Sequence, residues 1–231
     1  MYILDNKIFI HIVKCGGSSI REGIYKNRRQ DLKFCSEHFP IKLLNEKYKN
    51  YDKITIIREP ISWYKSFYNY TIQMNKNKGS IFNALANMLV YKDNKRLPFR
   101  DFVINATNLE LFFKDRDKIK ILINKIRNGK FSKSNYFNLI FDDYTDENEF
   151  VEKFSSSCYQ FFINSVGGFD VDRFYHSGDD LIYDEFNINK RKKNQTKTSL
   201  VKDSEITEEI KNLIHKYDHK VYEHFNIKKE L

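Results

Sequence analysis

The chain has 231 residues, of which 41% are hydrophobic and 31% are charged. These values are typical of a folded globular protein and exclude a disordered or collagen-like chain. No apolar run approaches the roughly 20 residues that a membrane-spanning helix needs, so we expect no membrane span. We also expect no secretory signal, because the N-terminal segment has neither a long apolar region nor a cleavage site.

The net charge indicates the class of binding partner, and the cysteines indicate the cellular compartment. The formal net charge is +9, from 40 Lys and Arg against 31 Asp and Glu. Such a balance favours anionic partners, namely nucleotides, nucleic acids or acidic glycans, although a biased genome composition explains it equally well. The cysteines Cys15, Cys35 and Cys158 match neither a disulfide framework nor a zinc pattern. We therefore predict a cytoplasmic protein without a metal site.

The first third of the chain alternates between predicted strands and predicted helices. Residues 7–12 form a β-branched and aromatic run typical of a buried strand, and Ser18 or Ser19 can cap a helix over residues 20–27. The next predicted elements are a strand at 32–36, a helix at 41–48, a strand at 53–58 and a helix from Pro60. This alternation predicts an α/β fold with a parallel central sheet and helices on both faces.

The rest of the chain is predicted to be mainly helical. The expected elements are helices at 81–90, 99–106 and 109–130, a strand near 161–166, a basic loop at 187–199, and a last helix capped by Asp203 or Ser204. No linker long enough to divide the chain separates these elements. We therefore predict one domain over residues 1–231, with a helical middle region at about 73–130.

A glycine-rich turn follows the first predicted strand. It consists of Lys14, Cys15, Gly16, Gly17, Ser18 and Ser19, and is called the glycine turn below. Glycines let backbone N–H groups approach an anion, and the N-terminus of the following helix adds a partial positive charge. Lys14 adds a mobile positive charge, and its spacing differs from that of a Walker A loop. The turn therefore has the composition of a phosphate or sulfate cradle, with a purely structural turn as the alternative.

A second candidate ligand site follows the third predicted strand. Arg58 lies at the carboxyl end of this strand, where open α/β sheets bind ligands. Ser66 follows about two helical turns into the next helix. Arg58 can bind a phosphate through two N–H groups while Ser66 donates a hydroxyl. The structural alternatives are a salt bridge of Arg58 with Glu59 or with a helix partner, and an exposed helix position for Ser66.

Three segments resemble motifs of one enzyme family. Residues 9–20, FIHIVKCGGSSI, resemble the 5′-phosphosulfate loop of sulfotransferases that use 3′-phosphoadenylyl sulfate. Residues 57–68, IREPISWYKSFY, are similar to the 3′-phosphate motif of this family. Residues 37–40, EHFP, are similar to a His-Phe-Pro stretch of its carbohydrate branch, which contains heparan 2-O-sulfotransferases and bacterial relatives. The resemblance is specific over about residues 7–70.

The resemblance implies a P-loop-like central parallel sheet flanked by helices. It also implies transfer of a sulfuryl group from 3′-phosphoadenylyl sulfate to an acceptor hydroxyl, on a carbohydrate, leaving adenosine 3′,5′-bisphosphate. Three positions depart from the family pattern: Val13, Cys15 and Trp63 stand where relatives commonly have Pro, Thr and Arg. The first two departures remove no charged contact, so we expect donor binding to be kept and acceptor choice to differ.

The resemblance also assigns roles to individual residues. Lys14 would neutralise charge on the leaving phosphate, and His38 would be the general base, with Glu37 as its substitute. The implied donor-binding residues are Lys14, Cys15, Gly16, Gly17, Ser18, Ser19, Arg58, Ser66, and, from the late basic loop, Lys190 and Arg191. Within this set, the glycine turn would hold the 5′-phosphate, and Arg58 with Ser66 would hold the 3′-phosphate.

Two other functions stay open at the level of sequence. A nucleotide-dependent phosphotransferase of related architecture is one, although the Walker spacing is missing. A non-catalytic basic protein that binds nucleic acid is the other, because the net charge of +9 permits it. Under the sulfotransferase interpretation no nucleic-acid partner is expected, and salt dependence separates the two, since nucleic-acid affinity falls steeply with ionic strength.

Overall fold

The computed structural model describes residues 1–73, 81–128, 154–190 and 199–229. The chain divides into two compact units, each built from two separate stretches. The first unit comprises Met1–Glu59 and Phe162–Gln195, and the second comprises Pro60–Phe161 and Thr196–Leu231. The single-domain interpretation stays a prediction, and the two units are described separately below.

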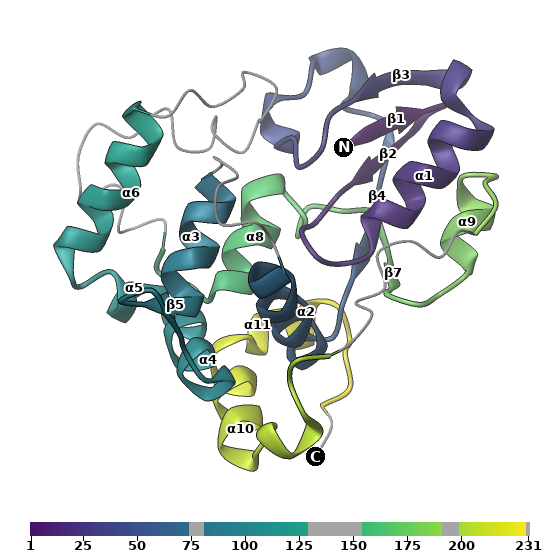
Figure 1. Ribbon diagram of the computed structural model, residues 1–231. Coiled ribbons are helices and arrows are strands. Elements are labelled where there is room, and N and C mark those ends of the chain that lie inside the picture. The colour runs from purple at the N-terminus through teal and green to yellow at the C-terminus, as the bar shows by residue number, and fades with distance from the viewer. Residues whose placement is uncertain (74–80, 129–153, 191–198, 230–231) are drawn as a thin grey trace. The chain divides into compact units, whose positions relative to one another are not determined.

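The first unit is built on a sheet of five strands in the order β3-β1-β2-β4-β7 (Figure 1). The strands are β1 (Tyr2–Leu4), β2 (Lys7–Ile10), β3 (Leu32–Cys35), β4 (Asp52–Ile57) and β7 (Arg173–His176). Strands β2, β4 and β7 are parallel, whereas β1 runs antiparallel to both β2 and β3. The predicted α/β class is confirmed, but the expectation of a wholly parallel sheet is wrong, because the sheet is mixed and mostly parallel.

The antiparallel strand β1 arises from a tight turn near the start of the chain. Leu4 pairs with Lys7 across this turn, and Asp5 within it adopts a left-handed φ of 49°. Asp and Asn adopt left-handed backbone angles more readily than other non-glycine residues, which suits a two-residue hairpin. The sequence prediction missed β1 because its apolar run is only three residues long.

Helix α1 (Gly17–Asn27) follows β2 and begins earlier than predicted. The helix was expected to start near residue 20 with Ser18 or Ser19 as its cap. Instead Gly16 is the N-cap, at a φ of 99°, and no side chain in the described part of the chain caps the helix. The first backbone N–H groups of a helix have no acceptor within it, so this start is suited to face a ligand.

The segment between β3 and β4 differs from the single helix predicted at 41–48. It contains two short 3-10 helices, η2 (Ile41–Leu43) and η3 (Glu46–Tyr48), and another, η1 (Arg29–Asp31), precedes β3. The side chain of Asn45 accepts a hydrogen bond from the N–H of Lys47 and starts η3 as a separate turn. This local bond competes with a continuous helix.

The strand predicted near 161–166 is wrong, because this segment is helix α8 (Cys158–Val166). Buried residues recur at helical spacing along it, at Tyr159, Phe162, Ile163 and Val166. The helix ends at Gly167, whose φ is 74°, where the N–H of Gly168 donates to the carbonyl of Ile163 at 2.8 Å. A short aromatic run can form either a strand or a buried helix, and its local sequence does not decide between them.

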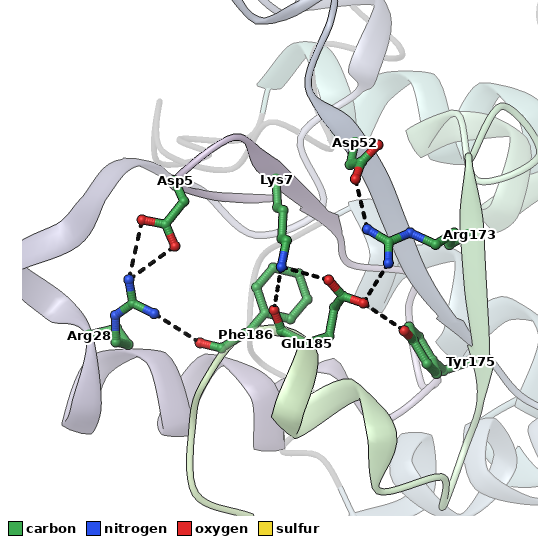
Figure 2. A network of polar contacts seen from close by, with 8 residues as sticks. All are labelled: Asp5, Lys7, Arg28, Asp52, Arg173, Tyr175, Glu185 and Phe186. Carbon is green, nitrogen blue, oxygen red and sulfur yellow. Dashed lines mark hydrogen bonds and ion pairs between the residues drawn. The ribbon is translucent and has the colours of Figure 1, made fainter.

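A polar network joins α9 (Leu181–Glu185) to the amino ends of the parallel strands (Figure 2). The carboxylate of Glu185 accepts from Lys7 Nζ at 2.7 Å, Arg173 Nη1 at 2.6 Å and Tyr175 Oη at 2.8 Å. Arg173 also bonds Asp52 at 2.7 Å, at the start of β4. We call this side of the sheet, at Lys7, Asp52 and Arg173, the amino edge.

The second unit is mainly helical within the described residues. It contains α2 (Pro60–Gln73), α3 (Ile81–Val90), α4 (Phe99–Thr107), α5 (Leu109–Phe112), α6 (Arg116–Asn128), η5 (Asp203–Glu205), α10 (Glu208–Tyr217), α11 (His219–His224) and a small hairpin, β5 (Tyr91–Lys92) with β6 (Lys95–Arg96). The predicted helices at 81–90 and 99–106 are confirmed. The helix predicted at 109–130 is two helices, and the cap of α10 is Thr207, where Asp203 or Ser204 was expected.

The core of the second unit is aromatic and contains the buried carboxylate of Asp218. Trp63 is fully buried and stacks on Tyr159, with 4.5 Å between ring centroids. The fully buried Asp218 accepts hydrogen bonds from the hydroxyls of Tyr64, at 2.8 Å, and Ser157. In the described part of the chain, no helix has both the length and the apolar character needed to cross a membrane.

Candidate anion-binding site

Three loops of the first unit begin where β2, β4 and β7 end. They carry the glycine turn, Arg58 and Ser177, which follow Ile10, Ile57 and His176 respectively. Because the three strands are parallel, these loops leave the same side of the sheet, which we call the carboxyl edge. Ligands of open α/β sheets bind at this edge.

The glycine turn has the backbone shape expected of a cradle. Lys14 and Gly16 have left-handed φ values of 63° and 99°. The N–H of Cys15 donates to the carbonyl of Ile12 at 3.4 Å, and the side chain of Cys15 is buried. A Cβ at Gly17 would lie 2.1 Å from the His11 ring, so only glycine fits there without a shift. His11 therefore fixes the point at which α1 starts.

Two cations of the first unit influence one another at the carboxyl edge. Burial and, to a smaller extent, the positive charge of Arg58 together lower the pKa of Lys14 to about 8. Arg58 Nη2 donates to Ser177 Oγ at 3.3 Å, and a Cβ placed on Gly16 would lie 3.7 Å from the same oxygen. The guanidinium of Arg58 is thereby held close to the glycine turn. Two neighbouring cations beside a helix N-terminus form an environment in which a bound anion is favoured.

His38 is held against the loop that follows β2. Its Nδ1–H donates to the carbonyl of His11 at 2.8 Å, and the two rings lie 4.5 Å apart between centroids. Burial lowers the pKa of His38 to about 4, so the ring is neutral at pH 7. Because Nδ1 carries the proton in this bond, Nε2 is the nitrogen that can accept one. His38 therefore has the protonation state that a general base requires.

His11 is a candidate site residue that the sequence interpretation did not separate from its strand. It is 5% exposed, its Nδ1 has no hydrogen-bond partner among the described residues, and burial lowers its pKa well below the usual value. Its ring lies against both Gly17 and His38. A single buried imidazole thus connects the anion cradle with the candidate base.

The substitute base Glu37 is engaged elsewhere. Its carboxylate forms an ion pair with Arg21 on α1. This pairing holds the exposed carboxylate against α1. Between the two candidates, the geometry favours His38.

Other predicted site residues are not placed at the carboxyl edge by the described contacts. Ser66 is half-buried on α2 and belongs to the second unit, so its pairing with Arg58 stays a prediction. Lys190 is exposed and forms an ion pair with Asp180. Arg191 lies outside the described residues. Trp63 is fully buried, so a charged ligand contact at this position is absent in this chain.

Ser177 was missed because β7 was missed. The signal for this strand is the aromatic run Phe174, Tyr175 and His176, followed by turn-forming residues from Ser177 onward. Its short length made it easy to assign to a loop. The contact with Arg58 also depends on the register between β4 and β7, which a single sequence does not show.

The described residues contain no group of three or more His, Cys, Asp or Glu side chains arranged to hold a metal ion.

No family model matches the chain, and neither the curated proteins nor the solved structures contain a match to it. The functional assignment therefore depends on the motifs and on the geometry of the carboxyl edge.

Proposed function

We propose that the protein is a sulfotransferase that moves a sulfuryl group from 3′-phosphoadenylyl sulfate to an acceptor hydroxyl, on a carbohydrate. The observation that carries this proposal is the convergence of Lys14, Arg58 and the glycine turn at the carboxyl edge. The positive charge of Arg58 makes the charged form of Lys14 less favourable, and a nucleotide with several negative charges would relieve this repulsion. A P-loop-like identity of the fold is part of the proposal.

In this proposal the acceptor oxygen attacks the sulfur atom as the bond from sulfur to the bridging phosphate oxygen breaks. Lys14 neutralises the charge that develops on that phosphate. Backbone N–H groups at the start of α1 hold the 5′-phosphate, and Arg58 holds the 3′-phosphate. Positioning and electrostatic stabilisation supply most of the rate enhancement in such an in-line transfer.

His38 takes the proton of the acceptor hydroxyl. Its neutral ring, with Nδ1–H bound to the carbonyl of His11, presents Nε2 for this purpose. A positioned general base contributes about 10²–10⁴ in rate. None of the three cysteines forms a disulfide, which suits the proposed cytoplasmic location.

The first test is calorimetric titration with adenosine 3′,5′-bisphosphate, beside AMP and ATP, at moderate salt. The proposal expects micromolar binding of the bisphosphate and much weaker binding of the other two. Preference for ATP would favour the phosphotransferase alternative. Equal or absent binding of all three would remove the sulfotransferase proposal and leave a basic nucleic-acid-binding protein as the better candidate.

Two variants separate the roles of the cations. Lys14→Ala is expected to lower turnover far more than it weakens binding of the bisphosphate, because its charge acts on the leaving group. Arg58→Ala is expected to abolish the preference for the bisphosphate over AMP. The matched control is Lys53→Ala, which removes a lysine that pairs with Asp172 at the other end of β4. If Arg58→Ala keeps the preference, Arg58 does not bind the 3′-phosphate.

A further inference from the structure

A serine outside the family motifs lies beside Arg58. Ser177 is the first residue after β7, and its backbone N–H donates to the carbonyl of Ile57 at 2.7 Å. This bond joins the last residue of β4 to the first residue after β7, so the position of Ser177 relative to Arg58 is set by the sheet. Ser177 is half-buried, as is Arg58.

The hydroxyl of Ser177 lies close to both Arg58 and Gly16 at the carboxyl edge. It accepts a hydrogen bond from Arg58 Nη2 at 3.3 Å, and it lies 3.7 Å from the position that a Cβ on Gly16 would take. A serine hydroxyl has one proton to donate and two lone pairs that accept. Since Arg58 uses a lone pair of this oxygen, the proton of the hydroxyl can be donated to a ligand at the same place.

The turn after Ser177 leaves room on this side. Gly178 has a left-handed φ of 106°, and a Cβ there would meet nothing within 4 Å among the described residues. A glycine with this φ and open surroundings lets the chain turn away from the edge directly after the serine. The backbone therefore presents Ser177 without covering it by the next side chain.

We propose that Ser177 determines specificity for the phosphate that Arg58 binds. Its oxygen aims the guanidinium of Arg58 at the glycine turn, and its hydroxyl donates to the same phosphate monoester group. This inference rests on the proposed function, because it takes that phosphate to be the 3′-phosphate of the nucleotide. It adds a third loop, the one after β7, to the donor site.

The test compares Ser177→Ala and Ser177→Thr with the unaltered protein by calorimetric titration. Ser177→Ala is expected to weaken binding of adenosine 3′,5′-bisphosphate by about 10- to 100-fold, the effect of losing a hydrogen bond to a charged group. Binding of AMP should change much less, so the ratio of the two affinities falls. Ser177→Thr keeps the hydroxyl and should restore both affinity and ratio.

The control is Ser165→Ala, which removes a half-buried serine whose hydroxyl donates to the carbonyl of Phe162 within α8. It should leave both affinities unchanged. The ratio is measured on folded protein only, so a change in stability does not alter it. If the unaltered protein prefers the bisphosphate and Ser177→Ala keeps that preference, the role of Ser177 is overturned and the proposed function stands. If the unaltered protein shows no preference, the proposed function fails and this inference fails with it.

Discussion

Lys14 and His38 have pKa values that burial moves away from those of free side chains. The pKa of Lys14 is lowered to about 8 and that of His38 to about 4, so at pH 7 the lysine is mostly charged and the histidine is neutral. This combination is the one that the proposed reaction needs, with a cation for the leaving phosphate and a base for the acceptor hydroxyl.

The first prediction concerns the pH dependence of kcat/KM. Its value should rise as His38 loses its proton near pH 4 and fall as Lys14 loses its proton near pH 8. A steady-state pH profile of the sulfuryl transfer measures both limbs. Lys14→Arg should move the alkaline limb to higher pH, because arginine stays charged throughout this range. An alkaline limb that stays in place in Lys14→Arg would assign it to another group.

At the scale of residues, the sequence indicates which residue types could act at the site, but not which side chains contact one another. Lys14, Arg58 and His38 could be selected because each stands next to the end of a predicted strand. The contact of Arg58 with Ser177 and the packing of His11 against Gly17 could not be predicted. Both depend on side chains that come together only when strands far apart in the chain are paired in the correct register.

Helix α1 is the element whose start determines the anion cradle. Gly17, its first residue, lies directly over the buried ring of His11. A methyl group there would overlap that ring. His11 is 5% exposed, and its ring also packs against the ring of His38. The start of α1 and the orientation of the candidate base are therefore linked.

The second prediction is that Gly17→Ala destabilises the protein and lowers affinity for adenosine 3′,5′-bisphosphate. Overpacking of this kind costs about 1–3 kcal/mol, because the helix start or His11 must shift. Urea unfolding measures the stability, and calorimetry measures the affinity. Ser18→Ala, one residue later in the same turn and half-exposed, is the control and should leave stability nearly unchanged. Equal stability of Gly17→Ala and the unaltered protein would contradict the packing argument.

Helix α9, in contrast, is held at the amino edge by ion pairs and hydrogen bonds of Glu185. The side chain of Glu185 is 10% exposed and accepts from Lys7, Arg173 and Tyr175 (Figure 2). Burial acts to raise the pKa of Glu185, but the hydrogen bonds from Lys7 and Tyr175 and the charges of Lys7 and Arg173 outweigh it and lower the pKa. The ionised carboxylate is therefore the form that stabilises the fold.

The third prediction is that Glu185→Gln lowers the free energy of unfolding by about 1–3 kcal/mol at neutral pH, the cost of losing charge-assisted hydrogen bonds. Because the folded pKa is below the unfolded value of 4.5, the stabilisation is complete above that value and is lost as the pH falls through the folded pKa. The difference between variant and unaltered protein should therefore shrink in acid, as measured by urea unfolding at several pH values. Affinity for the bisphosphate should stay unchanged, since the network lies at the amino edge. A difference that grows in acid would contradict the assigned charge state.

Predictions of elements succeeded for two helices with a clear periodic pattern, whereas the helix predicted at 109–130 is two helices, α5 and α6. The helices α3 and α4 follow clear periodic patterns and were located within one or two residues. The aromatic segment of α8 was misassigned because a run of this length fits a strand as well as a buried helix. The strands β1 and β7 are too short to be distinguished from loops, although β7 positions part of the candidate site.

In the first unit as a whole, the two edges of the parallel strands carry different kinds of side chain. The amino edge gathers paired charges, Asp52 with Arg173 and Lys7 with Glu185. The carboxyl edge gathers cations, a glycine-rich loop and a neutral histidine. Under the proposed function, stability would depend on the amino edge and ligand binding on the carboxyl edge, so substitutions at the two edges should have separable effects.

The last prediction concerns the net charge of +9, which acts on the whole molecule. A positive field attracts any polyanion, and its effect declines as salt screens it. Binding of the bisphosphate at the carboxyl edge should weaken moderately from low to high ionic strength, while its preference over AMP persists, because that preference comes from defined contacts with Arg58. Binding of a DNA oligonucleotide should instead fall by orders of magnitude, since it depends on release of counterions from many phosphates. Parallel titrations across a salt series measure both. If DNA binding resists salt while the preference between nucleotides disappears, the positive surface is the functional feature and the carboxyl edge is not.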